Sequence, residues 1–296
     1  MLPGAANNPT SGAGLEEAGV FVRRLVEFGP RLTEINNDAV NILGGLSGTF
    51  GDGLYDWELG ISYNKTELDI DSNNIHLSAL NAAVEEGLDL FRPIPDETVD
   101  FLSFDANQNA YSTNHLFDFS IAGDLDLQLG NGPIKFALAL EQVKESYLDR
   151  PDAIILKGDG FDGSSEGRGE RNHLGIGGEL NFPFTESLEL NVALRWDDYD
   201  DDSDVNSAIS PRLAMAYSLS DKFLARFSWG KSFRAPDMQR LFGGETKGFN
   251  DIVDPEENGR VVQSVPIVTV SNIELEEERG TNVNLGFVWQ AMILIT

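Results

Sequence analysis

The chain has 296 residues, enough for one large β domain or two ordinary ones, and 41% of them are hydrophobic. Its formal net charge of −28 argues against nucleic acid as a partner, because phosphate binding needs a basic surface. The absence of cysteine rules out disulfides and thiolate metal sites. No apolar run approaches about 18 residues, which excludes a membrane-spanning helix but not membrane-spanning strands of about 10 alternating residues.

The N-terminal residues 1–17 are small and polar, so we expect an irregular segment. They contain neither the basic nor the apolar part of a secretory signal. Either the protein is cytosolic or this is not its natural start.

Alternation of apolar and polar residues predicts strands through most of the chain, since a period of two gives one apolar and one polar face. In 54–64, Tyr55, Trp57 and Leu59 share one face, with aromatic residues near both ends. Residues 75–91 instead have the spacing and alanine content of a short amphipathic helix, and 95–109 is loop-like. The predicted strands are 19–28, 39–50, 54–64, 114–129, 134–147, 171–182, 188–197, 209–219, 223–233 and 281–289.

The connections between these strands alternate in length along the chain. Short turns are predicted at 51–53, 130–132, 183–186 and 220–221. Longer connections are predicted at 65–113, 149–170, 198–206 and 234–280. Consecutive antiparallel strands place every second connection at the same end, so all the long loops meet at one rim. Outer-membrane β-barrels sort their loops in this way, with apolar faces toward lipid and polar faces toward the lumen.

One part of this pattern carries a recognisable motif. The residues are Arg195, Trp196, Asp197, Asp198 and Tyr199, then Ser210, Pro211 and Arg212, then Ser232, Phe233, Arg234, Ala235 and Pro236, with Leu241 and Phe242. This series resembles the late barrel of TonB-dependent outer-membrane receptors. A looser match continues over 272–286, where Glu276 and Glu277 depart from the family's pattern. The resemblance covers about 19–290 and is strongest in 188–243.

The resemblance implies an all-β, antiparallel transmembrane barrel with short periplasmic turns and long extracellular loops. The family's barrel has about 22 strands around an N-terminal plug. The ten or eleven strands predicted here account for roughly half of such a barrel. We therefore expect an irregular segment at 1–17 and a partial barrel domain at 18–296, without plug or final strands.

The function implied by the resemblance is uptake of a scarce solute, such as a ferric siderophore, a cobalamin-like compound or an oligosaccharide. Ligand capture would fall to the long loops, and no cofactor is expected. The TonB system would act only through the plug, which this sequence lacks. The remaining partners would be lipid and lipopolysaccharide of the bacterial outer membrane. Two other functions stay open, a passive porin or structural barrel and a soluble all-β binding protein.

Several segments could be interpreted as ligand-binding sites, but for each of them a purely structural role is favoured. The acidic run 197–204 fails the spacing of a calcium-binding EF-hand and is expected to be a solvated loop. The glycine-rich segment 158–163 is not followed by a helix within a βαβ unit, so it is not a nucleotide-binding loop. In the motif, Pro236 is expected to end its strand and Arg234 to pair inside the wall.

Catalysis and metal binding are not expected from this sequence. Asp124 and Asp126 share the polar face of one strand and have no identifiable nucleophile or base beside them. The three histidines are widely spaced and are expected to be ordinary polar residues rather than metal ligands. The histidines are His76, His115 and His173.

Overall fold

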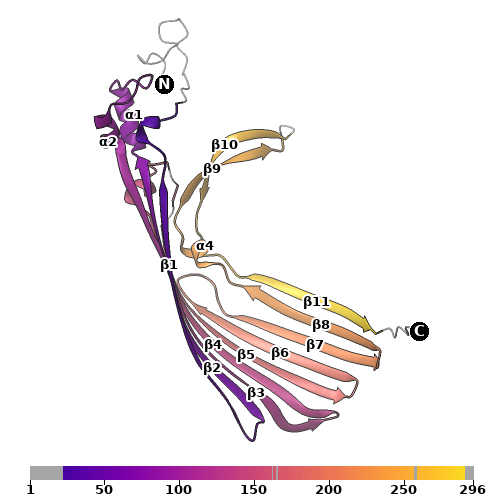
Figure 1. Ribbon diagram of the computed structural model, residues 1–296. Helices are drawn as coiled ribbons and strands as arrows, with labels where there is room; N and C mark the ends of the chain where they lie inside the picture. The colour runs from indigo at the N-terminus through magenta and orange to yellow at the C-terminus, as the bar shows by residue number, and fades with distance from the viewer. Residues whose placement is uncertain (1–22, 162, 165, 257–258, 291–296) are drawn as a thin grey trace, which may run out of the picture.

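The computed structural model describes residues 23–161, 163–164, 166–256 and 259–290, so the predicted segment 1–17 lies outside the described residues. Nine strands form one antiparallel sheet in the order β1-β2-β3-β4-β5-β6-β7-β8-β11 (Figure 1). Each strand except β11 pairs with the strand before it in the chain. The strands of the sheet are β1 (Thr33–Phe50), β2 (Tyr55–Ile75), β3 (Ser103–Leu129), β4 (Gly132–Arg150), β5 (Gly167–Thr185), β6 (Leu188–Asp200), β7 (Ala208–Ser220), β8 (Phe223–Arg234) and β11 (Glu278–Trp289).

The alternating pattern explains the two faces of this sheet. Its apolar face carries Trp57, Phe119 and Leu194, and its polar face carries Asp118 and Arg195, because neighbouring residues on a strand point to opposite sides. The predicted turn after β1 is confirmed, with positive φ angles at three consecutive residues of the Gly-Asp-Gly segment 51–53.

The connections lie at the two ends of the sheet as the alternation of lengths predicted. Short turns join β1 to β2, β3 to β4, β5 to β6 and β7 to β8. At the other end, which we call the long-loop end, the connections carry helices α1 (Leu77–Glu85), α2 (Asp96–Leu102), α3 (Ala153–Leu156) and α4 (Met238–Phe242). The prediction of one long loop over 234–280 missed a hairpin, β9 (Thr246–Asp254) and β10 (Arg260–Thr269), which forms a separate two-stranded sheet (Figure 1).

Strands β2 and β3 are much longer than predicted, with 21 and 27 residues. Both continue past the apolar stretch with polar residues on each face, so they lose the alternation by which strands are recognised. The loop expected over 65–113 therefore shrinks to the segment between Ile75 and Ser103. Within it, the helix predicted over 75–91 is confirmed only over Leu77–Glu85, in the first two thirds of the predicted range. The loop predicted over 95–109 is wrong, since α2 and the start of β3 occupy it.

The strand predicted over 19–28 is also wrong in its described part. Residues 26–28 form a short 3-10 helix, η1 (Val26–Phe28). Arg23 donates to the backbone carbonyls of Leu90 (2.8 Å) and Arg92 (2.9 Å). The carboxylate of Glu27 accepts a hydrogen bond from the backbone N–H of Ile94 at 3.1 Å. These contacts hold the segment against the loop between α1 and α2 rather than in the sheet.

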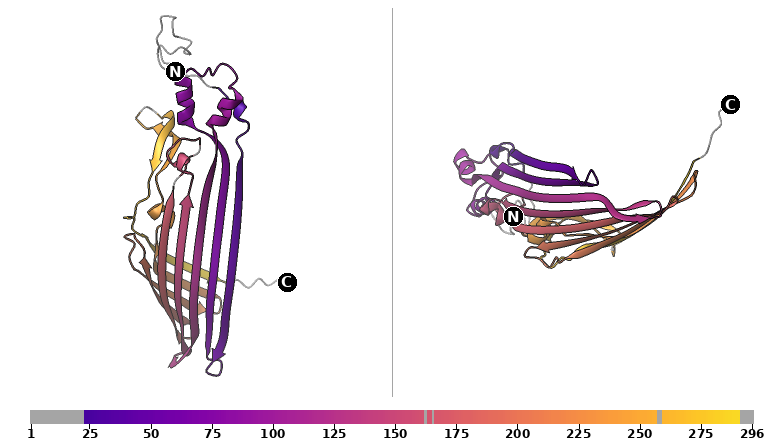
Figure 2. Two further views of the ribbon diagram at one scale, coloured as in Figure 1. Left: turned by 90° about the vertical axis from the view of Figure 1, so that its left-hand side faces the viewer. Right: turned by 90° about the horizontal axis from the view of Figure 1, so that it is seen from below.

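The sheet is an open, curved wall, as the view from below in Figure 2 shows. Its edge strands β1 and β11 do not pair with each other. The antiparallel open sheet confirms the predicted kind of fold, a segment of a barrel wall, and nine of the ten predicted strands lie in it. The tenth, 19–28, is not a strand in its described part, and the hairpin β9–β10 was not predicted. Among the described residues, no helix is long and apolar enough to cross a membrane.

Candidate functional site

The central part of the motif lies on the polar face where β4, β5 and β6 approach the long-loop end. Asp197 is only 2% exposed, and its carboxylate accepts a hydrogen bond from Nε of Arg195 at 2.9 Å. His173 Nε2 lies 2.8 Å from the same carboxylate, and Arg195 also reaches Glu141 at 3.2 Å. A Cβ at Gly175 would lie 2.4 Å from the Arg195 guanidinium, so glycine is needed for the arginine to cross β5.

A second group of side chains continues this network toward the loops. Nε of Arg171 donates to the Asp201 carboxylate at 2.6 Å, and the two side chains are 5% and 0% exposed. Arg171 also donates to the backbone carbonyl of Pro236 at 3.0 Å, which ties β5 to the segment after β8. The Arg171 guanidinium lies 5.2 Å from the ring centroid of Tyr199, whose ring stacks on His173 and meets the edge of Phe233. We call Arg171, His173, Arg195, Asp197, Tyr199 and Asp201 the motif cluster.

The electrostatics of the motif cluster favour fixed ion pairs. Burial alone raises the pKa of Asp201, but hydrogen bonds from Ser203 and Arg171 outweigh it, so the pKa lies below the usual carboxyl value. Removing one partner of such a buried pair leaves an uncompensated charge, which is strongly destabilising. The cluster therefore holds three strands and two loops in one arrangement.

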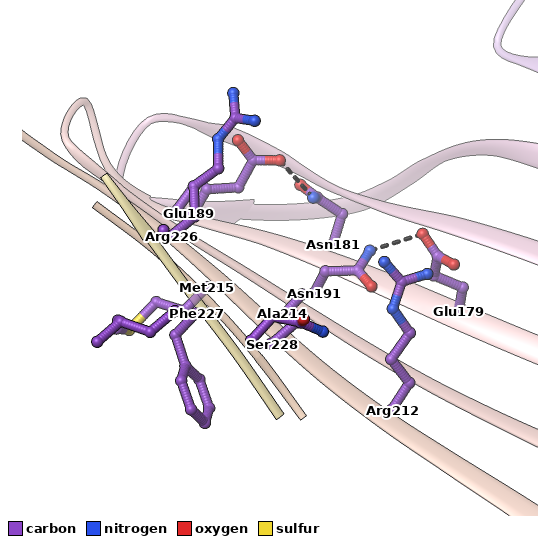
Figure 3. Close-up of a pocket in the computed structure, with 14 residues that line it drawn as sticks. Glu179, Asn181, Glu189, Asn191, Arg212, Ala214, Met215, Arg226, Phe227 and Ser228 are labelled. Carbon is purple, nitrogen blue, oxygen red and sulfur yellow. Dashed lines mark hydrogen bonds between the residues drawn. The ribbon is translucent and has the colours of Figure 1, made fainter. Parts of the chain in front are cut away.

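A second candidate site is a polar pocket of about 610 Å³ on the same face, nearer the short turns (Figure 3). Asn191 donates to Glu179 and Asn181 donates to Glu189, each at 2.6 Å. Figure 3 shows these side chains on one side of the sheet and Phe227 on the other. The pocket is lined from β5, β6, β7, β8 and β11, including Arg212 and Arg226.

The sequence matches the family model for the TonB dependent receptor-like β-barrel over residues 4–294. The chain belongs to this family. No curated protein matches the sequence.

Solved structures of similar fold include receptors and transporters. The RagAB peptide transporter is 11% identical, with a TM-score of 0.54 and coverage of 89% of this chain and 29% of that chain. The siderophore receptor PirA from Pseudomonas aeruginosa is 17% identical, with a TM-score of 0.49 and coverage of 86% and 44%. PirA from Acinetobacter baumannii is 14% identical, with a TM-score of 0.47 and coverage of 87% and 41%. The chain thus spans less than half the length of each.

The receptor motif is divided by the structure into two groups. Arg195, Asp197, Tyr199, Phe233 and Pro236 meet in or beside the motif cluster. The remaining motif residues are placed elsewhere: Pro211 and Arg212 lie on β7, and Arg234 and Ala235 lie at the end of β8 and just beyond it.

In the segment Phe-Arg-Ala-Pro at 233–236, the proline has the predicted role but the arginine does not. Strand β8 ends at Arg234, just before Ala235 and Pro236, which fits the expected role of the proline. Arg234 does not pair inside the wall: its side chain is 67% exposed and contacts Asp237 at 3.3 Å, three residues away. The residue that reaches Pro236 from within the sheet is Arg171.

Sequence reasoning missed Arg171, Glu141 and Asp201, because the pairs that they form join residues far apart in the chain. A signal was present in the segment 171–175, where Arg, His and Gly alternate and so share one face of a strand. Within the described residues, no three histidine or acidic side chains gather as a metal site. The expectation that the acidic run 197–204 is a solvated loop is wrong in part: its first four residues lie on β6, and Asp197, Tyr199 and Asp201 belong to the motif cluster.

Proposed function

We propose that this chain forms part of the wall of an outer-membrane receptor that imports a scarce solute with energy supplied through TonB. The observation that carries this proposal is the family match over residues 4–294 of a chain whose long loops share one end. Ferric siderophores, cobalamin-like compounds and oligosaccharides are the candidate solutes. The family and the similar structures are receptors and transporters rather than enzymes.

The apolar face supports a membrane location for this wall. Leu194, Leu285 and Phe287 are 54%, 67% and 62% exposed, although a water-soluble sheet would cover such side chains. On a barrel wall they would contact lipid, and the polar face would line the lumen. The long loops would then lie outside the cell, in contact with solute and lipopolysaccharide.

Import is proposed for the whole receptor, because this chain spans less than half of the receptors that it resembles. We would delete the natural gene and measure uptake of a labelled ferric siderophore, cobalamin and a maltodextrin under solute limitation. We expect loss of uptake for one of them, restored by the full-length gene only in cells that carry TonB. Restored uptake without TonB would instead support a passive porin. Recovery of the protein in the soluble fraction would contradict the membrane location.

A further inference from the structure

A cavity of about 500 Å³ lies on the apolar face of the sheet, opposite the face that carries the motif cluster. Residues of β1, β2, β3, β4 and β5 line it. Its part nearer the short turns is formed by Ile42, Ile61 and Phe117, which are 62%, 59% and 39% exposed. These side chains are not covered by the described part of the chain, so an apolar group from outside the chain can lie on them.

The part of this cavity nearer the long loops is polar. Four of its residues lie on neighbouring strands, and strand register places them directly opposite one another: Tyr63, His115, Lys144 and Asn172. Side chains in directly opposite positions have Cβ atoms about 5 Å apart, so these four form a continuous row. The ring centroids of Tyr63 and His115 are 4.8 Å apart. We call this set the interface row, and it combines a cation with hydrogen-bond donors and contains no carboxylate.

The interface row lies at the level where a lipid headgroup would meet the sheet. On β2, the side chains of the apolar face are aromatic or aliphatic from Tyr55 to Tyr63, and Lys65 follows them. From Tyr55 to Tyr63 the strand rises by about 26 Å, close to the height of about 25 Å of the apolar band of a membrane barrel. Tyrosines at both ends of such a band are typical of the two membrane interfaces. The row therefore lies at the interface nearer the long loops.

Lys144 is the side chain of the interface row that can neutralise an anion. It is exposed, and within the described residues its ammonium forms neither an ion pair nor a hydrogen bond. Lys65, on the same face, is instead paired with Glu67 at 2.5 Å. A carboxylate follows one strand beyond the row, where Asp200 lies opposite Asn172. The positive charge available to a ligand is therefore confined to Lys144 and its immediate neighbours.

We propose that this cavity binds one phosphate-bearing lipid of the outer leaflet, with the phosphate on the interface row and an acyl chain beside it. Lys144, His115 and Asn172 would donate hydrogen bonds to phosphate oxygens, and those from Lys144 are charge-assisted. The acyl chain would lie along Ile42 and Phe117, held by van der Waals contact. The phosphate-bearing lipid on the side of the long loops is lipopolysaccharide. This inference rests on the membrane location in the proposed function, but on neither import nor the solute.

The test measures binding of lipid A, the diphosphorylated membrane anchor of lipopolysaccharide, to the full 296-residue chain in detergent by native mass spectrometry. The comparison probes are the same lipid without its phosphates and inorganic phosphate without a lipid. We expect one lipid A molecule to bind about tenfold more tightly than the dephosphorylated lipid. Excess inorganic phosphate should not displace it. Equal binding of the two lipids would overturn the role of the phosphate, and displacement by inorganic phosphate would overturn the lipid as the ligand.

Two substitutions locate the lipid site. Lys144→Gln should weaken lipid A binding about tenfold, the loss expected for one charge-assisted hydrogen bond, and His115→Ala should weaken it less. The matched control is Lys231→Gln. Lys231 is an exposed lysine on the same face, two residues beyond Trp229 of β8, and it does not line the cavity. General attraction of an anionic lipid to interfacial lysines would give Lys144→Gln and Lys231→Gln equal effects. Equal effects, or none at Lys144, would overturn the site.

A second measurement does not depend on refolding of the chain. The full-length receptor is extracted from outer membranes in mild detergent, and the lipid A that stays bound is counted. The Lys144→Gln variant should retain less lipid A than the parent and the Lys231→Gln variant. A receptor that imports a solute, but retains lipid A equally in all three forms, keeps the proposed function and loses this site. A receptor that loses lipid A through Lys144→Gln, while the parent imports nothing, keeps the site and loses the function.

Discussion

The wall and the long-loop end of this chain both contain apolar side chains, but only the long-loop end buries them. Among the described residues, the buried apolar side chains gather at the long-loop end: Ile75, Ile94, Leu102, Ala106, Ile155, Val205, Ala208 and Leu241. Along the wall, side chains of the same kind are exposed, as at Leu285 (67%) and Trp289 (71%). The long-loop end therefore packs its apolar side chains against one another, whereas the wall leaves its apolar face uncovered.

The wall and the long-loop end also differ in how far they bury polar side chains. The buried pair of Arg171 and Asp201 lies where the wall meets the loops, and Asn74 is buried at the end of β2. Nearer the short turns, the polar residues Asn181 and Asn191 bond across the exposed face of the sheet. A substitution of a similar kind should therefore change stability by different amounts in the two regions.

The largest effect is expected at Asp201. Replacing it with alanine leaves the buried Arg171 without its carboxylate, which costs about 3–5 kcal/mol of local stability. The measurement is the free energy of opening from hydrogen exchange of the amides in 201–207, in detergent. Asp202→Ala removes a neighbouring exposed carboxylate and should change that free energy by less than about 0.5 kcal/mol. Equal values for the two variants would show that the buried pair contributes nothing.

A core substitution tests the packing of the long-loop end directly. Leu102, at the end of α2, is 0% exposed, so Leu102→Ala should cost about 2–5 kcal/mol through lost burial and a cavity. Its neighbour Phe101 is 74% exposed, and Phe101→Ala should change stability by less than about 0.5 kcal/mol. Hydrogen exchange of α1 and α2 would report both values. A larger loss for Phe101→Ala would mean that this surface is covered by another part of the receptor.

On the wall, the cost of a substitution should depend on the solvent. Leu194 is 54% exposed on the apolar face, so Leu194→Arg would have almost no cost in water. In a bilayer, an arginine near the midplane of the lipid-facing surface costs about 2–4 kcal/mol. We would compare the free energies of unfolding in lipid vesicles with those of Ala193→Arg, which places the charge on the polar face. Equal stabilities for the two variants would contradict contact of the apolar face with lipid.

The wall and the long-loop end also differ in how much of their structure could be predicted from the sequence. The wall was predictable, because alternation of residues such as Tyr55 and Trp57 follows directly from strand geometry. The long-loop end was not: β3 begins among polar residues at Ser103, and Arg23 and Glu27 bond to a loop that follows 67 to 69 residues later. The motif residues Asp197 and Tyr199 were identified by resemblance. Their partners Arg171 and Glu141 depend on strand register, which sequence spacing alone does not give.

The smallest effect concerns a contact between two long loops. Asp159, after α3, accepts hydrogen bonds from the backbone N–H (2.6 Å) and the hydroxyl (2.7 Å) of Ser78, at the start of α1. The backbone hydrogen bond from Ser78 is the main cause of a pKa below the ordinary value of 3.8, and His76 lowers it further. Because the folded carboxyl has the lower pKa, its stabilisation is complete above the ordinary value and is lost as the pH falls through the folded value.

Amide exchange of Ser78, corrected for its intrinsic pH dependence, should therefore lose protection as the pH falls from about 5 to about 2. Protection of amides in the β4–β5 ladder should change less over the same range, since their hydrogen bonds do not involve a carboxylate. Asp159→Asn keeps an acceptor oxygen but cannot titrate, so protection of Ser78 in this variant should be lower and independent of pH. An Asn variant that keeps the pH dependence of the parent would show that another group titrates at this contact.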